Sequence, residues 1–419
     1  MDQSPLCPMK AKVVTLGCKV NQYEGRCLEE LLEVHGYTLT EQQADLCVIN
    51  SCSVTARADR KTKNAVKNAR KENPSARLVL CGCYSESDEP SFRTLGVEIF
   101  VPPDRKTSLI SFLNGNTPSP GDVRNFSLRR FHSRRAFLKI QDGCDIRCAF
   151  CKIPSMRGPS RSRPLEPILE ETRHLVRFHP EIVLCGVNIG LYGKDLRPES
   201  SLPRLLDALL AVADLQRIRL GSLDTVFVTR ETLNFLAHPA MAPHLHLSFQ
   251  SGDDSVLKAM GKPDRTADYA AAVENARKIC PHVAISCDIL VGFPAEGEHQ
   301  FQNTLAFLER IRPMRTHIFT FSPREGTPLS RTPGPGSREK KRRYRTVRAH
   351  AEKYAREYVR RQIQAPQRMV AEERDGEWTR GTTGTYLKVS VRERLPLGRI
   401  YSVIPVTQAA NGIVAVRNH

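Results

Sequence analysis

Hydrophobic positions in the first 115 residues alternate between short apolar runs and longer amphipathic stretches. The runs Lys12–Leu16, Asp45–Asn50 and Arg77–Leu80 are apolar enough to form buried strands. Between them, apolar residues recur at helical spacing up to Val34, and a polar, basic helical stretch covers residues 56–72. Alternating strand and helix patterns are typical of a parallel sheet, so this block is predicted to be an α/β domain.

The same alternation resumes at least six times between residues 136 and 325. The expected strands begin near Phe137, Ile182, Ile218, Leu245, Ile285 and Thr316. Helical patterns lie between them, for example over residues 168–178 and 269–279. Six strand–helix units predict a partial TIM-type (β/α)6 barrel, a fold that places its chemistry at the carboxyl ends of the strands.

The residues from about Ala365 onward form short strand-like runs separated by turn formers. This spacing favours a small β-barrel of the OB type, which often binds nucleic acid. A linker rich in Pro, Gly and Asn covers residues 114–121. Three domains are therefore expected, over residues 1–120, 130–363 and 364–419.

Positive charge is in large excess, with 63 Lys and Arg against 45 Asp and Glu, a net charge of +18. Such a balance favours a polyanionic partner, because binding releases the counterions condensed on it. Residues 337–362 alone hold eleven Lys or Arg against three Glu, with Tyr344, Val347, Tyr354 and Tyr358 on one helical face. This helix either docks its tyrosines on the barrel and leaves its charges in water, or contacts nucleic acid directly, and both roles are compatible.

The expected location is the cytoplasm, without a membrane anchor. No run of about 18 apolar residues is present, and Met1–Pro5 has no secretion-signal pattern. Thirteen cysteines, an odd number, argue for a reducing compartment. In such a compartment cysteine serves as a metal ligand or as a small buried residue.

Three cysteines form a Cys-x3-Cys-x2-Cys array at Cys144, Cys148 and Cys151. Three thiolates hold three irons of a 4Fe-4S cluster and leave the fourth iron open for chemistry. The array follows the strand-like run Phe137–Ile140, so it is predicted to lie on a strand-to-helix loop. The alternative is a structural zinc site, but no second Cys-x2-Cys or His-x3-His pattern lies nearby.

Three further cysteines, Cys18, Cys52 and Cys83, each come just past the end of a predicted strand. The carboxyl ends of parallel strands meet at one edge of a sheet, so these thiols are expected to converge. The alternative is three small buried residues at turns. Spacing alone leaves Cys81 open as the third ligand in place of Cys83, whereas Cys27 and Cys47 occupy predicted core positions.

Several stretches together resemble the radical S-adenosylmethionine methylthiotransferases. They cover residues 15–24, 50–55, 82–84, 143–151, 154–163, 247–252 and 322–328. The resemblance extends over nearly the whole chain, and the C-terminal block resembles the TRAM domain of that family. The stretch Leu16–Glu24 is similar to the branch that acts on threonylcarbamoyladenosine in tRNA, since the isopentenyladenosine branch typically carries Gln-Met-Asn there.

The resemblance implies two 4Fe-4S clusters and S-adenosylmethionine as cofactors. Cys144, Cys148 and Cys151 would hold the cluster that binds and cleaves S-adenosylmethionine. Cys18, Cys52 and Cys83 would hold a second cluster that carries the sulfur to be inserted. Phe150, Gly186 and Gln250 would contact the cofactor.

The implied product is the 2-methylthio derivative of N6-threonylcarbamoyladenosine at position 37 of tRNA. The implied partners are tRNA and an electron donor such as flavodoxin or ferredoxin, and the sulfur donor is not identified. The alternatives are isopentenyladenosine tRNA or a ribosomal-protein aspartate as substrate, or a zinc-stapled RNA-binding protein without activity. Asp224 stands where the family usually shows Glu-Pro, and Lys262–Asp264 replaces a more basic, tyrosine-bearing stretch.

Overall fold

A computed structural model of the chain describes residues 9–84, 88–116, 126–409 and 412–418. The chain divides into two compact units. The first contains residues 1–128 together with the short pieces 143–145 and 151–159, and the second contains residues 129–142, 146–150 and 160–419. The predicted linker at 114–121 lies outside the described residues from position 117 onward.

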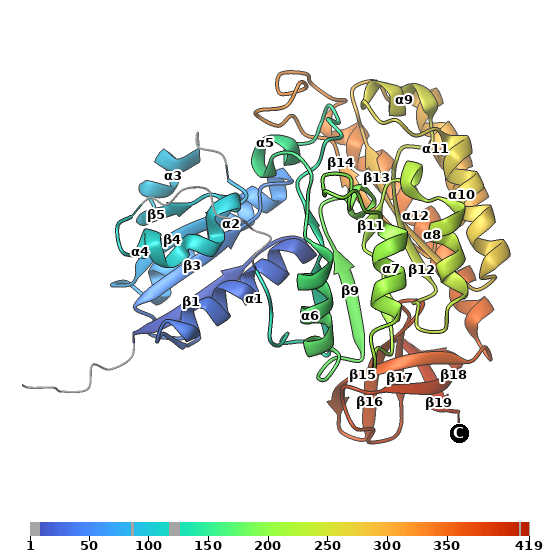
Figure 1. The fold of residues 1–419 in the computed structure, drawn as a ribbon. Coiled ribbons are helices and arrows are strands. Elements are labelled where there is room, and N and C mark those ends of the chain that lie inside the picture. The colour runs from blue at the N-terminus through green and yellow to red at the C-terminus, as the bar shows by residue number, and fades with distance from the viewer. Residues whose placement is uncertain (1–8, 85–87, 117–125, 410–411, 419) are drawn as a thin grey trace, which may run out of the picture. The chain divides into compact units, whose positions relative to one another are not determined.

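The first unit is a parallel five-stranded sheet in the order β2-β1-β3-β4-β5 (Figure 1). Its strands are β1 (Lys10–Thr15), β2 (Thr38–Leu39), β3 (Leu46–Ser51), β4 (Arg77–Gly82) and β5 (Val97–Val101). Its helices are α1 (Lys19–Val34), α2 (Ala56–Glu72), α3 (Glu89–Arg93), η2 (Pro103–Ser108), α4 (Leu109–Leu113) and α5 (Ile153–Arg157). All six residues of β3 are buried, as expected for a central strand covered on both faces. The predicted parallel α/β domain is confirmed, although β2 and β5 were not predicted.

The second unit contains a partial barrel of parallel strands in chain order. The strands are β6 (Arg135–Lys139), β9 (Glu181–Cys185), β10 (Ile218–Arg219), β11 (Ser222–Leu223), β12 (His244–Gln250), β13 (Ala284–Val291) and β14 (Arg315–Thr320). Only Leu220 and Gly221 separate β10 from β11, so the two form one interrupted strand. Six strand positions result, and the predicted (β/α)6 barrel is confirmed.

Helices cover the outside of these strands (Figure 1). They are α6 (Leu165–Leu175), η4 (Ile189–Leu191), α7 (Leu202–Leu210), η5 (Thr225–Phe227), α8 (Arg230–Asn234), η6 (Phe235–Ala237), α9 (Asp254–Ala259), α10 (Thr266–Ile279) and α11 (Glu298–Ile311). Phe249 on β12 stacks edge-on against Phe307 of α11, which shows that this side of the strand faces the helices. A short antiparallel pair, β7 (Gln141–Asp142) and β8 (Arg161–Ser162), flanks the predicted cluster loop.

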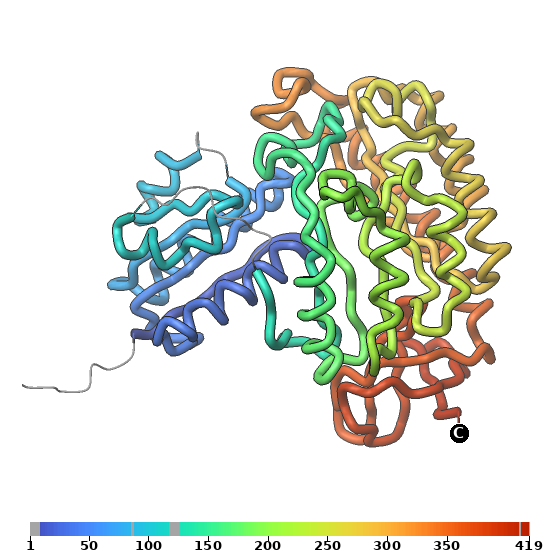
Figure 2. The backbone as a smooth tube through the Cα atoms, viewed as in Figure 1, coloured from blue at the N-terminus to red at the C-terminus, as the bar shows by residue number. Residues whose placement is uncertain are grey.

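The basic helix α12 (Ser337–Gln362) has the predicted bounds and packs along β14 (Figure 2). Val347, Tyr354 and Tyr358 are buried, so this helix does dock its apolar face. A closed barrel follows, formed by β15 (Gln367–Asp375), β16 (Trp378–Thr383), β17 (Lys388–Val391), β18 (Ile400–Ala409) and β19 (Gly412–Arg417). Only the β17–β19 pair is parallel, and the predicted small β-domain is confirmed.

Buried charges fix this small barrel to the start of the larger barrel's strands. Arg217 and Arg219 donate to Glu181, the first residue of β9, at 2.6 and 2.7 Å. The same guanidinium groups donate to backbone carbonyls of the small barrel, among them Arg368 at 2.7 Å and Gly384 at 2.7 Å. The small barrel therefore sits at the amino ends of the strands and leaves their carboxyl ends clear. No helix in the described ranges is long and apolar enough to cross a membrane.

Candidate functional site

Cys18, Cys52 and Cys83 follow three adjacent strands of the first unit. β1, β3 and β4 lie side by side and parallel, with Thr15 opposite Asn50 and Asn50 opposite Cys81. Cys18 comes three residues after β1 ends, Cys52 directly after β3, and Cys83 directly after β4. The expected placement at one edge of the sheet is confirmed.

The turns at this edge bring the thiol-bearing loops close together. A Cβ atom on Gly17 would lie 2.6 Å from the Cβ of Cys52, so only glycine fits there. Gly82 has φ +99°, and a Cβ on it would lie 2.8 Å from the carbonyl oxygen of Ser51. Glycine next to Cys18 and next to Cys83 thus permits the tight turns that direct both loops toward Cys52.

The three thiols share one electrostatic environment. The pKa of Cys52 is raised to about 11, mainly by burial and also by the neighbouring thiols of Cys18 and Cys83, while Arg157 acts to lower it. Cys18 is exposed, whereas Cys52 and Cys83 are buried. One member of the triad therefore opens to solvent while two are enclosed.

Cys81 has different surroundings from Cys83. It lies within β4, and its Sγ contacts the Oδ1 of Asn50 at 3.9 Å. Burial raises its pKa to about 12. Cys83 lies past the strand end and accepts a hydrogen bond from Arg157, whose charge also reaches Cys18 and Cys52. The geometry thus groups Cys83, and not Cys81, with the other two thiols.

Hydrogen bonds hold the two ends and the centre of the array at residues 144–151 separately. In the first unit the Cys144 N–H donates to the Gly158 carbonyl at 3.1 Å, and the Cys151 Sγ accepts from the Ile153 N–H at 3.4 Å. In the second unit the Ala149 N–H donates to the Met260 carbonyl at 2.9 Å. All three cysteines are half-exposed.

The thiols offer soft donors of the kind that iron–sulfur clusters prefer. An N–H group directed at a cysteine sulfur, as at Cys151, stabilises a thiolate ligand. Among the described residues, no group of three or more His, Cys, Asp and Glu side chains is arranged to hold a single metal ion. The donor chemistry of each set of three cysteines fits an iron–sulfur cluster.

The expected cofactor contacts Phe150, Gly186 and Gln250 all lie in the second unit. Phe150 packs edge-on against Phe293, with the ring centroids 6.4 Å apart. A Cβ on Gly186 would lie 2.9 Å from the Oε1 of Gln141, so the backbone after β9 is closely approached. Gln250 ends β12 with φ +66° beside a register shift, which turns the chain at the barrel mouth.

The two sequence departures contact each other. Lys262 forms ion pairs with Asp224 and, at 3.4 Å, with Asp264, and it donates to the Ser248 carbonyl at 3.0 Å. Burial alone would lower the pKa of Lys262, but the two carboxylates raise it, so the ammonium group stays protonated. Lys262 also interacts electrostatically with Cys148. This ion-pair cluster therefore lies beside the centre of the cysteine array.

A polar group that was not predicted lies on the barrel's inner face. His246 donates to or accepts from Ser286 at 2.8 Å and lies 3.2 Å from the Asp288 carboxylate. The rings of His246 and His317 are 5.5 Å apart. Leu245, Leu247 and Phe249 of β12 are buried on one face. Since side chains alternate between the faces of a strand, this pattern in the sequence could have predicted that His246 lies on the opposite face.

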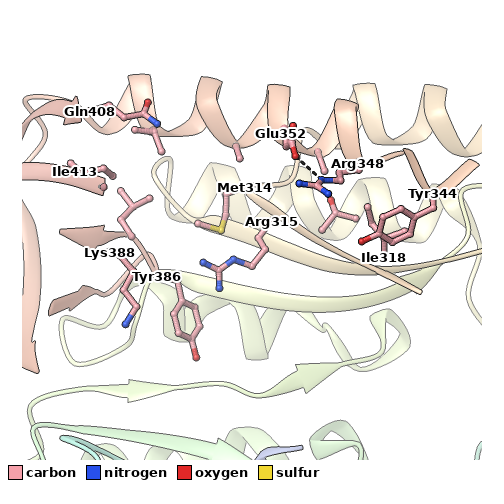
Figure 3. A pocket seen from close by; sticks show the side chains of 16 residues that line it. Met314, Arg315, Ile318, Tyr344, Arg348, Glu352, Tyr386, Lys388, Gln408 and Ile413 are labelled. Carbon is pink, nitrogen blue, oxygen red and sulfur yellow. Dashed lines mark hydrogen bonds and ion pairs between the residues drawn. The ribbon is translucent and has the colours of Figure 1, made fainter. Parts of the chain in front are cut away.

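A groove of about 480 Å³ lies where β14, α12 and the small barrel meet (Figure 3). Its lining includes Arg315 from β14, Tyr344 and Arg348 from α12, and Tyr386 and Lys388 from the small-barrel segment. One carboxylate, that of Glu352, lines it as well and pairs with Arg348 at 2.8 Å. The groove thus combines cations with aromatic rings, although Lys388 also pairs with Glu372 at 2.9 Å and the Tyr386 ring centroid lies 3.8 Å from the Arg219 guanidinium.

Two family models match the chain. The one described as "Uncharacterized protein family UPF0004" matches residues 10–101, and the one described as "Radical SAM superfamily" matches residues 138–308. The first match contains Cys18, Cys52 and Cys83, and the second contains the array at 144–151.

Curated relatives resemble the chain over most of its length. Threonylcarbamoyladenosine tRNA methylthiotransferase MtaB of Thermotoga maritima is 36% identical over 97% of this chain and 96% of its own. The protein of the same name from Rickettsia prowazekii is 29% identical over 94% of each chain. A tRNA-2-methylthio-N(6)-dimethylallyladenosine synthase from Herpetosiphon aurantiacus is 34% identical over 75% of this chain and 74% of its own.

Among solved structures, the radical S-adenosylmethionine methyltransferase TsrM from Kitasatospora setae, with cobalamin and a [4Fe-4S] cluster bound, has a similar fold. The TM-score is 0.57 at 14% identity, over 78% of this chain and 74% of the other. At this identity the likeness concerns the fold alone.

Proposed function

Because this chain belongs to the radical S-adenosylmethionine methylthiotransferase family, we propose that it methylthiolates threonylcarbamoyladenosine in tRNA. The observation that carries this proposal is the match to the Thermotoga maritima enzyme, which extends over 97% of one chain and 96% of the other. The product is the 2-methylthio derivative of N6-threonylcarbamoyladenosine at position 37. The relatives from Thermotoga maritima and Rickettsia prowazekii that match over 94% or more of both chains carry the threonylcarbamoyladenosine name, so the threonylcarbamoyl substrate is preferred.

The cofactors are two 4Fe-4S clusters and S-adenosylmethionine. In this proposal Cys144, Cys148 and Cys151 hold the cluster that binds S-adenosylmethionine, and Cys18, Cys52 and Cys83 hold the second. When bound, these groups supply the reductive cleavage of the sulfonium. They also supply the sulfur and the methyl group that are added at the adenine C2 carbon. The half-exposed array and the exposed Cys18 leave room for these reactants.

The chain's own residues orient and enclose these groups. The backbone contact from Ala149 to Met260 holds the centre of the array against the segment that carries Lys262. The charged Lys262 and its two carboxylates lie beside Cys148, where they orient the loop and its bound cofactor. Phe150, Gly186 and Gln250 line the cofactor's side of the barrel mouth in this proposal.

The tRNA contact is assigned to the small barrel and to α12. The net charge of +18 and the groove that holds Arg315, Tyr386 and Lys388 support this assignment, since cations neutralise phosphates and aromatic rings stack on bases. The proposed electron donor is a low-potential protein such as flavodoxin or ferredoxin, and the proposed location is the cytoplasm.

The test is nucleoside analysis of tRNA incubated anaerobically with reconstituted protein, S-adenosylmethionine and a reductant. We expect the 2-methylthio derivative of threonylcarbamoyladenosine from the unchanged protein. Cys148→Ala is expected to abolish both cofactor cleavage and methylthiolation. Cys52→Ala is expected to keep cofactor cleavage and to lose methylthiolation. Methylthiolation of dimethylallyladenosine tRNA alone would refute the proposed substrate, and full product from Cys52→Ala would refute the second cluster site.

A further inference from the structure

Arg157 places a buried positive charge at the edge of the sheet where the three thiols converge. It ends the short helix α5, and its contacts group it with the first unit. Its Nε donates to the Sγ of Cys83 at 3.3 Å. The side chain is only 1% exposed, so water does not screen this contact.

Two residues of the first unit, Glu24 and Asn21, hold the guanidinium in place. Glu24 accepts from Nη1 at 3.0 Å and from Nη2 at 3.1 Å, and the Oδ1 of Asn21 accepts from Nη2 at 2.6 Å. Asn21 is fixed in turn, because its Nδ2 donates to the Ser51 carbonyl at 2.6 Å. The Glu24 carboxylate and the Asn21 side-chain oxygen together fix the orientation of the planar guanidinium. In that orientation its Nε points toward Cys83.

A second cation shares the same carboxylate. Lys106 forms a buried ion pair with Glu24 and donates to the Oδ1 of Asn50 at 2.9 Å. Arg157 and Lys106 thus both bring positive charge to the carboxylate of Glu24 in a dry environment. Charges in such an environment interact strongly, and an anion at Cys83 is in position to be stabilised by Arg157. A cluster held by three thiolates is such an anion, whereas neutral thiols are not.

We propose that Arg157 is a positioning residue that sets the reduction potential of the second cluster through its contact with Cys83. The proposal rests on the proposed function, in which Cys18, Cys52 and Cys83 hold that cluster. A cationic hydrogen-bond donor at a ligand sulfur stabilises the more negative, reduced state, and so raises the potential. The segment that follows Cys151 in the chain therefore supplies the charge that tunes the site built by the first unit.

The experiment isolates the second cluster in the full-length chain. Cys144, Cys148 and Cys151 are all changed to Ala, the protein is reconstituted with iron and sulfide, and the midpoint potential is measured by redox titration with electron paramagnetic resonance. We expect Arg157→Met to shift the potential to a more negative value and Arg157→Lys to give a smaller shift in the same direction. Glu24→Gln, which removes the negative charge from the group, shifts it to a more positive value.

The matched control is Arg60→Met, which removes an exposed arginine of the first unit and is expected to leave the potential unchanged. A merely structural role would not produce shifts of opposite sign for Arg157→Met and Glu24→Gln. An unchanged potential in Arg157→Met at full iron content overturns the proposal. If Arg157→Met does not fold, a negative or absent shift in Glu24→Gln overturns it instead. Failure of the triple-alanine parent to bind any iron overturns the second cluster site itself, and this inference with it.

Discussion

A Cβ atom on Gly17 would lie 2.7 Å from the Sγ of Cys52, so the loop that carries Cys18 passes directly against the second thiol of its triad. Gly17 also has φ +96°, in the left-handed region that disfavours other residues by about 1–2 kcal/mol. The spacing of the triad thus depends on a residue without a side chain.

Gly17→Ala is therefore expected to displace Cys18 or Cys52 and to lower iron binding at the second site only. S-adenosylmethionine cleavage, which depends on the array at 144–151, is expected to persist. The matched control is Gly36→Ala, because Gly36 has a similar φ of +84° but nothing within 4 Å of an added Cβ. Equal iron loss in the two variants, measured per chain, would contradict the role of the Gly17–Cys52 contact.

Lys262→Met is predicted to destabilise the barrel by about 3–5 kcal/mol, because it leaves the buried Asp264 and the partly buried Asp224 without their cation. Urea unfolding measures this change. Adding Asp224→Asn to Lys262→Met is expected to recover part of the loss, since the double variant removes one of the uncompensated charges. Strictly additive losses in the double variant would show that the ion pair is not the source of the effect.

Lys262→Met also tests the contribution of Lys262 to cofactor binding. Lys262 lies beside Cys148, so Lys262→Met is expected to weaken S-adenosylmethionine binding even under conditions where the protein stays folded. Equilibrium dialysis with the reconstituted protein gives the affinity, and an unchanged affinity would limit Lys262 to a structural role.

His179 is predicted to make the stability of the second unit fall as the pH falls. Burial lowers its pKa from 6.5 to about 4, and its Nε2 accepts from the Phe131 N–H at 3.1 Å, which requires the neutral ring. The unfolded chain therefore binds a proton that the folded chain does not between pH 6.5 and about 4. Stability from this residue is complete above pH 6.5 and is lost as the pH falls through that window.

Thermal unfolding across that range measures the effect, which is expected to be on the order of 2–3 kcal/mol. His179→Gln is expected to flatten the dependence, whereas His299→Gln, a change at an exposed position of α11, leaves it as it is. An identical pH dependence in His179→Gln would contradict the buried neutral ring.

The groove between β14, α12 and the small barrel is predicted to bind tRNA phosphates. Arg315→Gln and Lys388→Gln are each expected to weaken tRNA binding and to reduce the slope of log K against log salt by about 1. Arg392→Gln serves as the control, because Arg392 is exposed on the same small barrel but does not line the groove. Equal slopes for the groove variants and the unchanged protein would show that tRNA does not bind at this groove.

Strand positions and thiol placement were predictable because they follow from local patterns. β1, β3 and β4 read as apolar runs, and a cysteine just past each run must lie at the carboxyl edge of a parallel sheet. β16 has no such signal, because Trp378–Thr383 is rich in Thr, Arg and Gly and lacks a clear apolar alternation.

Long-range contacts account for what the sequence could not reveal. Arg157 meets Cys83 and Glu24 across 74 and 133 positions of the chain, and nothing in its immediate neighbours indicates this. The pairing of Asp224 with Lys262 was equally hidden, since each residue separately looked like a departure from a family pattern. Spacing also left Cys81 and Cys83 equivalent, and only the side-chain surroundings separate them.

The proposed function requires two clusters on two separate sets of three cysteines. Iron and sulfide content per chain tests it directly, measured after anaerobic reconstitution of the unchanged protein and of two triple-alanine variants, one for each set. About eight irons are expected in the unchanged protein and about four in each variant. Four irons in the unchanged protein, or complete iron loss in either variant, would contradict the account.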